Sequence, residues 1–186
     1  MRHRKTFGIS GISSDGGMNW ATTEAWLSAL NAANYLGYSD WRLPHTLPVN
    51  GTAYNYNMSL DGSTDWAENI SAPGSAYPGA TGSEMAYMFY NNLHSRMWVG
   101  YYVHGDDGPF ENIRWYYWSE TPYGLDPDNA MWGFGSGQSA VPKYRNDFHA
   151  WVVFDGDVGT VPIPGAVWLL SPGLIGLLGL KRKILG

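Results

Sequence analysis

The chain has 186 residues, 16% of them aromatic, and no cysteine. A fold without cysteine has no disulfide, no thiol nucleophile and no thiolate metal site. Six of the eleven basic residues lie at 2–5 and 181–183, so the body between them holds 5 basic and 16 acidic residues, a net formal charge of −11. Such a body repels phosphate, which argues against nucleic acid as a partner.

The first residues, MRHRKTFGIS, are basic but contain no apolar run of the length that a secretory signal needs. The C-terminal segment described below predicts export, so we expect the natural beginning of the protein to lie upstream. The alternative is a vestigial C-terminal segment on a protein that stays inside the cell. We divide the chain into an N-terminal segment, 1–13, one domain, 14–157, and a C-terminal signal, 158–186.

Two amphipathic helices are expected. Apolar residues recur at helical spacing at Trp26, Leu30 and Ala33. They predict a helix over Trp20–Leu36, capped by Asn19 or Thr22, with Glu24 in its first turn and Gly37 at its end. A second stripe, at Met85, Phe89 and Leu93, predicts a helix over Ser83–Leu93, with Thr81 and Glu84 at the spacing of a capping box.

Residues His45–Ala80, between the two helices, are rich in Gly, Ser, Asn, Pro and Tyr and predict a long loop. After Leu93, short aromatic or β-branched runs at Ile113–Ser119, Ala130–Phe134 and His149–Phe154 predict an antiparallel meander. The expected fold is therefore α+β, with two helices packed on a small antiparallel sheet. Most tryptophans are expected in its core: Trp26, Trp41, Trp115, Trp118, Trp132 and Trp151.

Five short motifs are spread through the domain: Trp41-Arg42-Leu43-Pro44, Gly82-Ser83-Glu84-Met85, Tyr117-Trp118-Ser119-Glu120, Trp132-Gly133-Phe134 and Ala150-Trp151-Val152-Val153. With the helical run before Trp41 they resemble the Lcl C-terminal domain family. Arg-Leu-Pro also occurs in formylglycine-generating enzymes and their C-type-lectin-like relatives, so the resemblance implies a lectin-like module. Those enzymes depend on cysteine, so their activity is not expected here.

The motif residues Trp41, Arg42, Leu43, Pro44, Trp118 and Ser119 are interpreted as structural. A guanidinium holds a carboxylate through two parallel hydrogen bonds, and Arg42 is expected to join neighbouring elements in this way rather than bind a ligand.

No catalytic motif is present. The five histidines have no zinc-protease spacing, and no serine lies in a Gly-x-Ser-x-Gly elbow. Carboxylate pairs occur at Asp106-Asp107, Asp126 with Asp128, and Asp155 with Asp157, where turn formation explains them more simply than glycosidase chemistry. We expect no cofactor; calcium in these turns is a minor alternative.

Aromatic rings offer flat apolar faces to sugars, and four are interpreted as candidate ligand-binding residues: Tyr54, Tyr56, Trp66 and Trp98. The main hypothesis is a non-catalytic surface or matrix protein that binds extracellular polysaccharide. Two alternatives stay open. One is an envelope hydrolase with a carboxylate-based site, and the other is a purely structural matrix component.

The C-terminal segment has three zones: the motif Val161-Pro162-Ile163-Pro164-Gly165, an uncharged run over 166–180, and the basic end Lys181-Arg182-Lys183. This order resembles the PEP-CTERM class of bacterial sorting signals, in the variant that begins Val-Pro-Leu-Pro-Ala. The resemblance implies export, transient membrane anchoring through a hydrophobic helix at 166–180, and removal of the tail by an exosortase. An ordinary single-pass anchor is the alternative.

Overall fold

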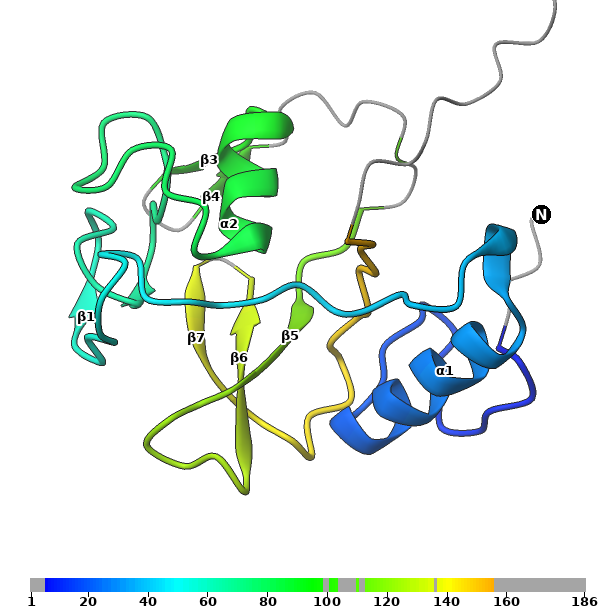
Figure 1. Cartoon of the computed structure of the whole chain (residues 1–186). Helices are drawn as coiled ribbons and strands as arrows, with labels where there is room; N and C mark the ends of the chain where they lie inside the picture. The colour runs from blue at the N-terminus through cyan, green and yellow to red at the C-terminus, as the bar shows by residue number, and fades with distance from the viewer. Residues whose placement is uncertain (1–5, 99–100, 104–109, 111–112, 136, 156–186) are drawn as a thin grey trace, which may run out of the picture. The chain divides into compact units, whose positions relative to one another are not determined.

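Figure 1 shows the computed structural model of the chain, which describes residues 6–98, 101–103, 110, 113–135 and 137–155. The chain divides into two units, Met1–Phe154 and Asp155–Gly186. The described part contains no helix that is long and apolar enough to cross a membrane. The sorting motif, the apolar run at 166–180 and the basic end lie outside the described residues.

The domain is α+β, with two helical segments and a five-stranded mixed sheet (Figure 1). The strand order is β1-β2-β7-β6-β5. The strands are β1 Met58–Ser59, β2 Trp66–Ala67, β5 Tyr117–Pro122, β6 Ala130–Phe134 and β7 Gln138–Pro142. Neighbours pair antiparallel except β1 and β2, which run parallel. A separate antiparallel hairpin joins β3 (Arg96–Trp98) to β4 (Tyr101–Val103).

Helix α1 spans Trp20–Ala32 and begins where the sequence predicts. The Asn19 side chain caps it by accepting a hydrogen bond from the Thr22 amide at 2.9 Å. The predicted end at Leu36 is wrong, because Asn34 and Leu36 adopt positive φ angles of 49° and 55°. A short 3-10 turn, η1 (Tyr35–Gly37), follows instead. The first turn of α1 holds no acidic residue, so the placing of Glu24 was also wrong.

The second helix covers nearly the predicted range, as α2 (Glu84–Tyr87) continued by a π-helical turn, η2 (Met88–Asn92). All three residues of the predicted stripe, Met85, Phe89 and Leu93, are buried. The capping prediction is wrong. Ser83 is the N-cap, because its hydroxyl accepts a hydrogen bond from the Ala86 amide at 3.3 Å.

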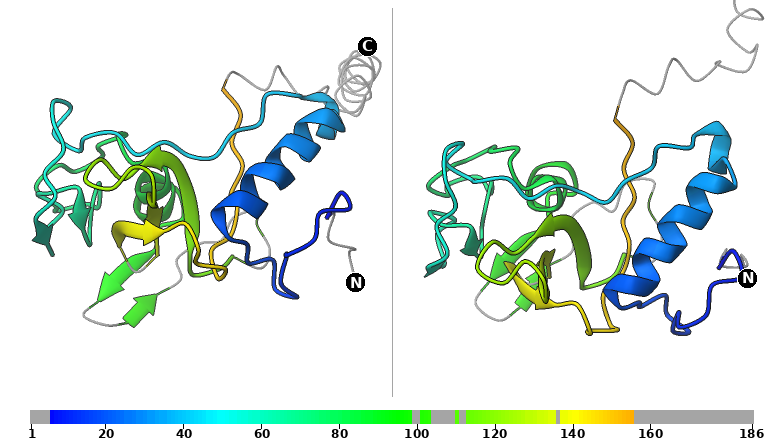
Figure 2. Two further views of the ribbon diagram at one scale, coloured as in Figure 1. Left: turned by 90° about the horizontal axis from the view of Figure 1, so that it is seen from below. Right: turned by 60° about the horizontal axis from the view of Figure 1, so that its bottom comes forward.

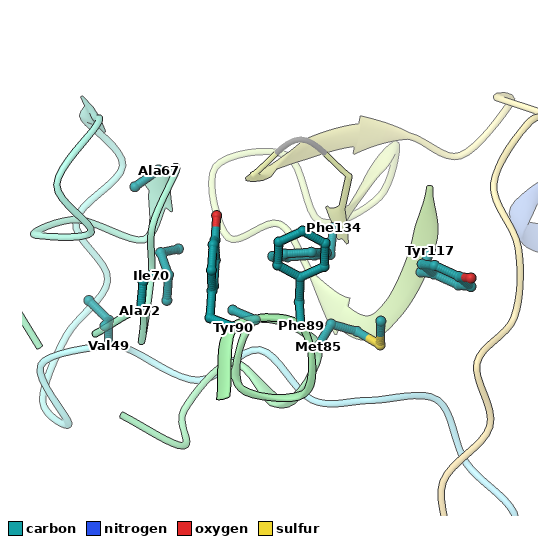
Figure 3. Packing of buried hydrophobic residues seen from close by; sticks show 10 residues of the cluster. Val49, Ala67, Ile70, Ala72, Met85, Phe89, Tyr90, Tyr117 and Phe134 are labelled. Carbon is teal, nitrogen blue, oxygen red and sulfur yellow. The ribbon is translucent and has the colours of Figure 1, made fainter. Parts of the chain in front are cut away.

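Strand β6 divides the core into two sides. Successive side chains of a strand point to opposite faces, and all five residues of β6 are buried. Phe134 packs with α2 and η2 on one face, at 5.3 Å between its ring centroid and that of Phe89 (Figure 3). Met131 lies in a cluster with Trp118, against which Trp20 and Leu27 of α1 pack. In both views of Figure 2, α1 lies to one side of the strands and segment 45–80 to the other.

Segment 45–80 is not the plain loop that its composition predicts. It supplies β1 and β2, and Ala67 of β2 pairs with Gln138 of β7, so the segment extends the main sheet. Val49, Ile70 and Ala72 from the same segment are buried in the core. Strands of two residues are too short to show an alternating pattern, which is why the sequence hid them.

The sequence predicts the antiparallel meander only in part. Strand β6 has the predicted bounds, whereas β5 begins at Tyr117 rather than Ile113, and β7 was missed. Residues 149–154 form no strand. They contribute only single bridges, from His149 to Tyr117 and from Val153 to Arg42.

The tryptophans divide by exposure. Trp118 and Trp132 are fully buried, as predicted, while Trp26, Trp41 and Trp151 are half-buried. Trp115 is 55% exposed, so its assignment to the core was wrong. It precedes β5 and lies outside the strands of the described residues.

Replacing Trp118 by alanine should lower the free energy of unfolding by about 3–5 kcal/mol, the usual cost of removing a buried aromatic side chain. The ring packs against Phe148 at 4.8 Å, and its indole N–H donates to the Met18 carbonyl at 2.9 Å. The matched variant Trp115→Ala should cost less than about 1 kcal/mol. Urea unfolding of both variants measures the difference, and equal losses would contradict this description of the core.

Candidate functional site

Arg42 forms a two-pronged ion pair with Glu84. Its two terminal nitrogens donate to the two carboxylate oxygens at 2.7 and 2.8 Å, and one of them also donates to the Leu43 carbonyl. The backbone of Arg42 pairs with Val153 through hydrogen bonds of 3.0 and 2.8 Å. Arg42 thus joins three distant segments, which is the structural arrangement that the motif interpretation favours.

The Glu84 carboxylate is held in its charged form. Burial alone would raise the pKa of Glu84, but hydrogen bonds from Arg42 and from the His45 amide, at 2.6 Å, outweigh it and lower the pKa. The His45 ring lies 3.1 Å from a carboxylate oxygen of Glu120. Glu84 and Glu120 therefore flank His45, one on its backbone and one on its ring.

The other motif residues anchor the chain around this ion pair. The Asn31 side chain bonds both the amide and the carbonyl of Trp41, and the Trp41 indole N–H donates to the Tyr35 carbonyl at 3.0 Å. Leu43 is buried, and the Ser119 hydroxyl accepts a hydrogen bond from Thr46. Pro44 is buried beside the pocket described below.

A fully buried carboxylate organises segment 45–80. Asp65 accepts hydrogen bonds from the amides of Val49 and Asn55, both at 2.7 Å, and its own carbonyl accepts one from Gln138 at 2.7 Å. Burial raises the pKa of Asp65, and the two amide donors oppose that rise. The segment carries Tyr54 beside this carboxylate, so Asp65 also sets the position of the candidate aromatic residues.

Three of the four candidate ligand-binding residues meet in one group of rings. We call Tyr54, Tyr56, Trp66, Tyr123 and Trp132 the aromatic cluster. Tyr56 stacks on Trp132 at 6.0 Å and 6° between ring planes, and Tyr54 stacks on it at 5.9 Å. Tyr123 meets Trp132, Tyr56 and Trp66 edge-on, at 4.8, 5.3 and 6.2 Å.

Exposure differs strongly across the aromatic cluster. Trp132 is fully buried, Tyr123 is 7% exposed, and Trp66 is 37% exposed. Trp66 pairs with Met58 across β1 and β2, and Met58 is 67% exposed. The cluster therefore has a buried base and an apolar outer edge. The fourth candidate, Trp98, lies in β3 of the separate hairpin.

The hydroxyl of Tyr54 is hydrogen-bonded within the fold. It donates to the Thr46 carbonyl at 2.7 Å, while burial and the nearby Asp65 carboxylate raise the pKa of Tyr54. The Tyr54 hydroxyl is therefore already used as a donor within the fold. Gly124 leaves room for Tyr56, because a Cβ at that position would overlap the Tyr56 hydroxyl.

A pocket of about 400 Å³ opens beside α2, a volume typical of small-molecule sites. We call it the α2 pocket. Its lining includes the apolar side chains of Met85, Met88 and Trp151 and the polar side chains of Thr81, Tyr87 and Glu84. Three of the five sequence motifs contribute to it, yet none of its lining residues was predicted to bind a ligand. Only the fold brings them together.

Asp126 and Asp128 lie together at a second pocket, of about 470 Å³, which Lys143 also lines. Asp126 accepts a hydrogen bond from the Asn129 side chain at 2.9 Å, as a turn-forming residue does. Among the described residues no group of three or more His, Asp or Glu side chains could hold a metal ion. The calcium alternative stays a prediction, because Asp106, Asp107 and Asp157 lie outside those residues.

Comparisons with protein-family models, with curated proteins and with solved structures return no match for this chain. The resemblances to the Lcl C-terminal domain and to PEP-CTERM signals thus rest on the sequence motifs.

Replacing Glu84 by glutamine should lower the free energy of unfolding by roughly 1–2 kcal/mol at pH 7, a modest amount because the side chain is a third exposed. The folded-state pKa lies below the ordinary value of 4.5, so this stabilisation is present above pH 4.5 and is lost as pH falls through the folded-state pKa. The difference between wild type and variant should therefore shrink in acid.

Chemical unfolding at a series of pH values measures this difference. The control is Glu24→Gln, because Glu24 is exposed on α1. A Glu84→Gln effect that is as large at pH 3 as at pH 7 would contradict the role of the charged carboxylate.

Proposed function

We propose that this chain is an exported, non-catalytic bacterial surface or matrix protein that binds uncharged carbohydrate at the outer edge of the aromatic cluster. The observation that carries the proposal is Trp66, a partly exposed indole supported edge-on by the nearly buried Tyr123 ring. A ring held in this way offers a rigid apolar surface to the C–H face of a sugar, and little side-chain entropy is lost on binding.

The support of the cluster is fixed by the fold. The stacked rings of Tyr54 and Tyr56 rest on the buried Trp132, and Asp65 holds the backbone before them at Val49 and between them at Asn55. Exposed Asn57 lies next to Met58 of β1 and provides an amide for sugar hydroxyls. This combination of an aromatic platform and neighbouring amides is typical of carbohydrate recognition.

Charge favours an uncharged sugar at this platform over a sulfated one. No lysine or arginine occurs between residues 43 and 95, the segment that provides Tyr54, Tyr56 and Trp66. Sulfate groups need cationic partners, and the body of the protein carries a net formal charge of −11.

The location and the family are part of the proposal. The Pro-containing motif at 161–165, the uncharged run and the basic end favour a sorting signal removed by an exosortase. The Trp-Arg-Leu-Pro motif favours membership of the Lcl C-terminal domain family and a C-type-lectin-like arrangement of the α+β fold.

The hydrolase alternative is less well supported. Glycosidase chemistry needs two carboxyl groups that face each other across a substrate cleft. Glu84 lines the α2 pocket, but Glu120 is not among the lining residues, and Glu84 is already held by Arg42. No observation favours a purely structural role over binding. A binding assay in which no glycan binds would favour the structural role.

Binding of the full-length protein to an array of neutral, amino and sulfated glycans tests the platform. We expect neutral glycans to bind, and Trp66→Ala to weaken their binding about tenfold, the effect of losing one stacked ring. The control is Tyr144→Ala, because Tyr144 is 78% exposed outside the cluster. Equal binding by both variants would contradict the platform, and no binding to any neutral glycan would contradict the function.

Expression in a bacterium that contains an exosortase tests the location, with a secretory signal joined upstream. We expect the tail to be removed from the natural sequence and retained in Pro164→Ala, because the proline-containing motif is the proposed recognition element. Mass measurement of the surface fraction distinguishes the two forms. Equal processing of both, or a permanently anchored natural sequence, would contradict the proposed sorting signal.

A further inference from the structure

The α2 pocket has the chemistry of a site for a positively charged group. Its single charged lining residue is Glu84, and no lysine or arginine lines it. A carboxylate, sulfate or phosphate would find no cationic side chain among the lining residues, whereas the exposed part of the Glu84 carboxylate, although paired with Arg42, can still accept a hydrogen bond from an ammonium. A metal ion would find only one carboxylate, whereas calcium takes six to eight oxygen ligands. A positive group with an apolar body fits both the charge and the apolar walls.

Arg42 fixes the Glu84 carboxylate without covering it. The Glu84 side chain is 34% exposed, while that of Arg42 is 17% exposed. Both carboxylate oxygens accept hydrogen bonds from Arg42, and one of them also accepts from the His45 amide. The carboxylate is therefore held in one orientation before any ligand arrives, which reduces the entropy lost on binding.

Aromatic rings strengthen the same preference. Trp151 and Tyr87 both line the α2 pocket, and the Trp151 ring is braced edge-on by Tyr117 at 5.3 Å between ring centroids. A cation within about 6 Å of a ring face is attracted by the ring, most strongly for tryptophan. The apolar side chains of Met85 and Met88 complete the wall and suit a ligand with C–H surfaces.

We propose that the α2 pocket binds the ammonium group of an amino sugar, with the carboxylate of Glu84 as its charged partner and Trp151 beside the sugar ring. The identity of the carrier as a sugar rests on the proposed carbohydrate binding. The aromatic cluster takes uncharged sugar units, and the α2 pocket takes a unit with a free amine. The preferred polymer is then an amino-sugar glycan with only part of its amines acetylated.

The net charge of the body agrees with such a polymer. A domain with a net formal charge of −11 attracts a polycation over the Debye length and repels acidic glycans. Binding is therefore expected to weaken as salt rises, in contrast to binding at the aromatic cluster.

The test uses the full-length protein and two oligosaccharides of equal length, a glucosamine tetramer with free amines and its fully N-acetylated counterpart. Calorimetry at low and high salt should show the amine form binding about tenfold tighter at low salt, with the advantage reduced at high salt. Equal affinities for the two tetramers would overturn the proposal.

Thr81→Lys tests the location without disturbing the Arg42 ion pair. Thr81 is exposed and lines the α2 pocket, so a lysine there brings a tethered ammonium that competes for Glu84. We expect about tenfold weaker binding of the amine tetramer. The matched control, Ser28→Lys, adds the same charge at an exposed position of α1, on the other side of the sheet, and should leave the affinity within about twofold. An equal loss in both variants would overturn the site.

Two outcomes of these binding measurements distinguish a failure of the amino-sugar site from a failure of the proposed function. If the acetylated tetramer binds in a Trp66-dependent way but Thr81→Lys has no effect, the amino-sugar site is wrong and the aromatic platform stands. If glucosamine binds in a Thr81-dependent way and no neutral glycan binds, the platform is wrong and the α2 pocket stands. Tighter binding of lysine amide than of glucosamine would overturn the assignment to a sugar.

Discussion

The ion pair between Arg42 and Glu84 is the contact on which the arrangement of the domain depends, because it joins residues 42 positions apart in the chain. The backbone of Arg42 also pairs with Val153. Arg42 therefore connects the segment after α1 with the start of α2 and with the segment around Val153. A charged pair this far from full burial contributes modest free energy. Its two-pronged geometry contributes specificity, since few other arrangements of the three segments satisfy all of the donors.

A second carboxylate, Asp65, has the same role for segment 45–80. It accepts hydrogen bonds from the amides of Val49 and Asn55, and the Val49 amide belongs to a buried residue for which a lost hydrogen bond would be costly. The segment is thereby held against the edge of the main sheet, and its tyrosines stack on Trp132 of β6. The two polar centres thus organise two different surfaces, the α2 pocket and the aromatic cluster.

The two surfaces are proposed to bind the two parts of one kind of ligand. Flat rings on a segment without lysine or arginine favour uncharged sugar faces, whereas a fixed carboxylate with aromatic walls favours an ammonium. Both features are compatible with an acidic body that repels polyanions. A protein of the cell surface or matrix that carries both would discriminate amino-sugar polymers from sulfated ones through charge and from neutral ones through the second site.

The sequence by itself determined the start of α1, the buried stripe of the second helix and the strand Ala130–Phe134, because helical spacing, capping residues and short aromatic runs are local signals. It also determined the acidic, cysteine-free body and the zones of the C-terminal segment. Only the tertiary structure decided that segment 45–80 adds two strands to the sheet, that Glu84 pairs with Arg42 instead of capping its helix, and that Trp151 joins it in a pocket. Those features depend on contacts between residues far apart in the chain, which no local pattern records.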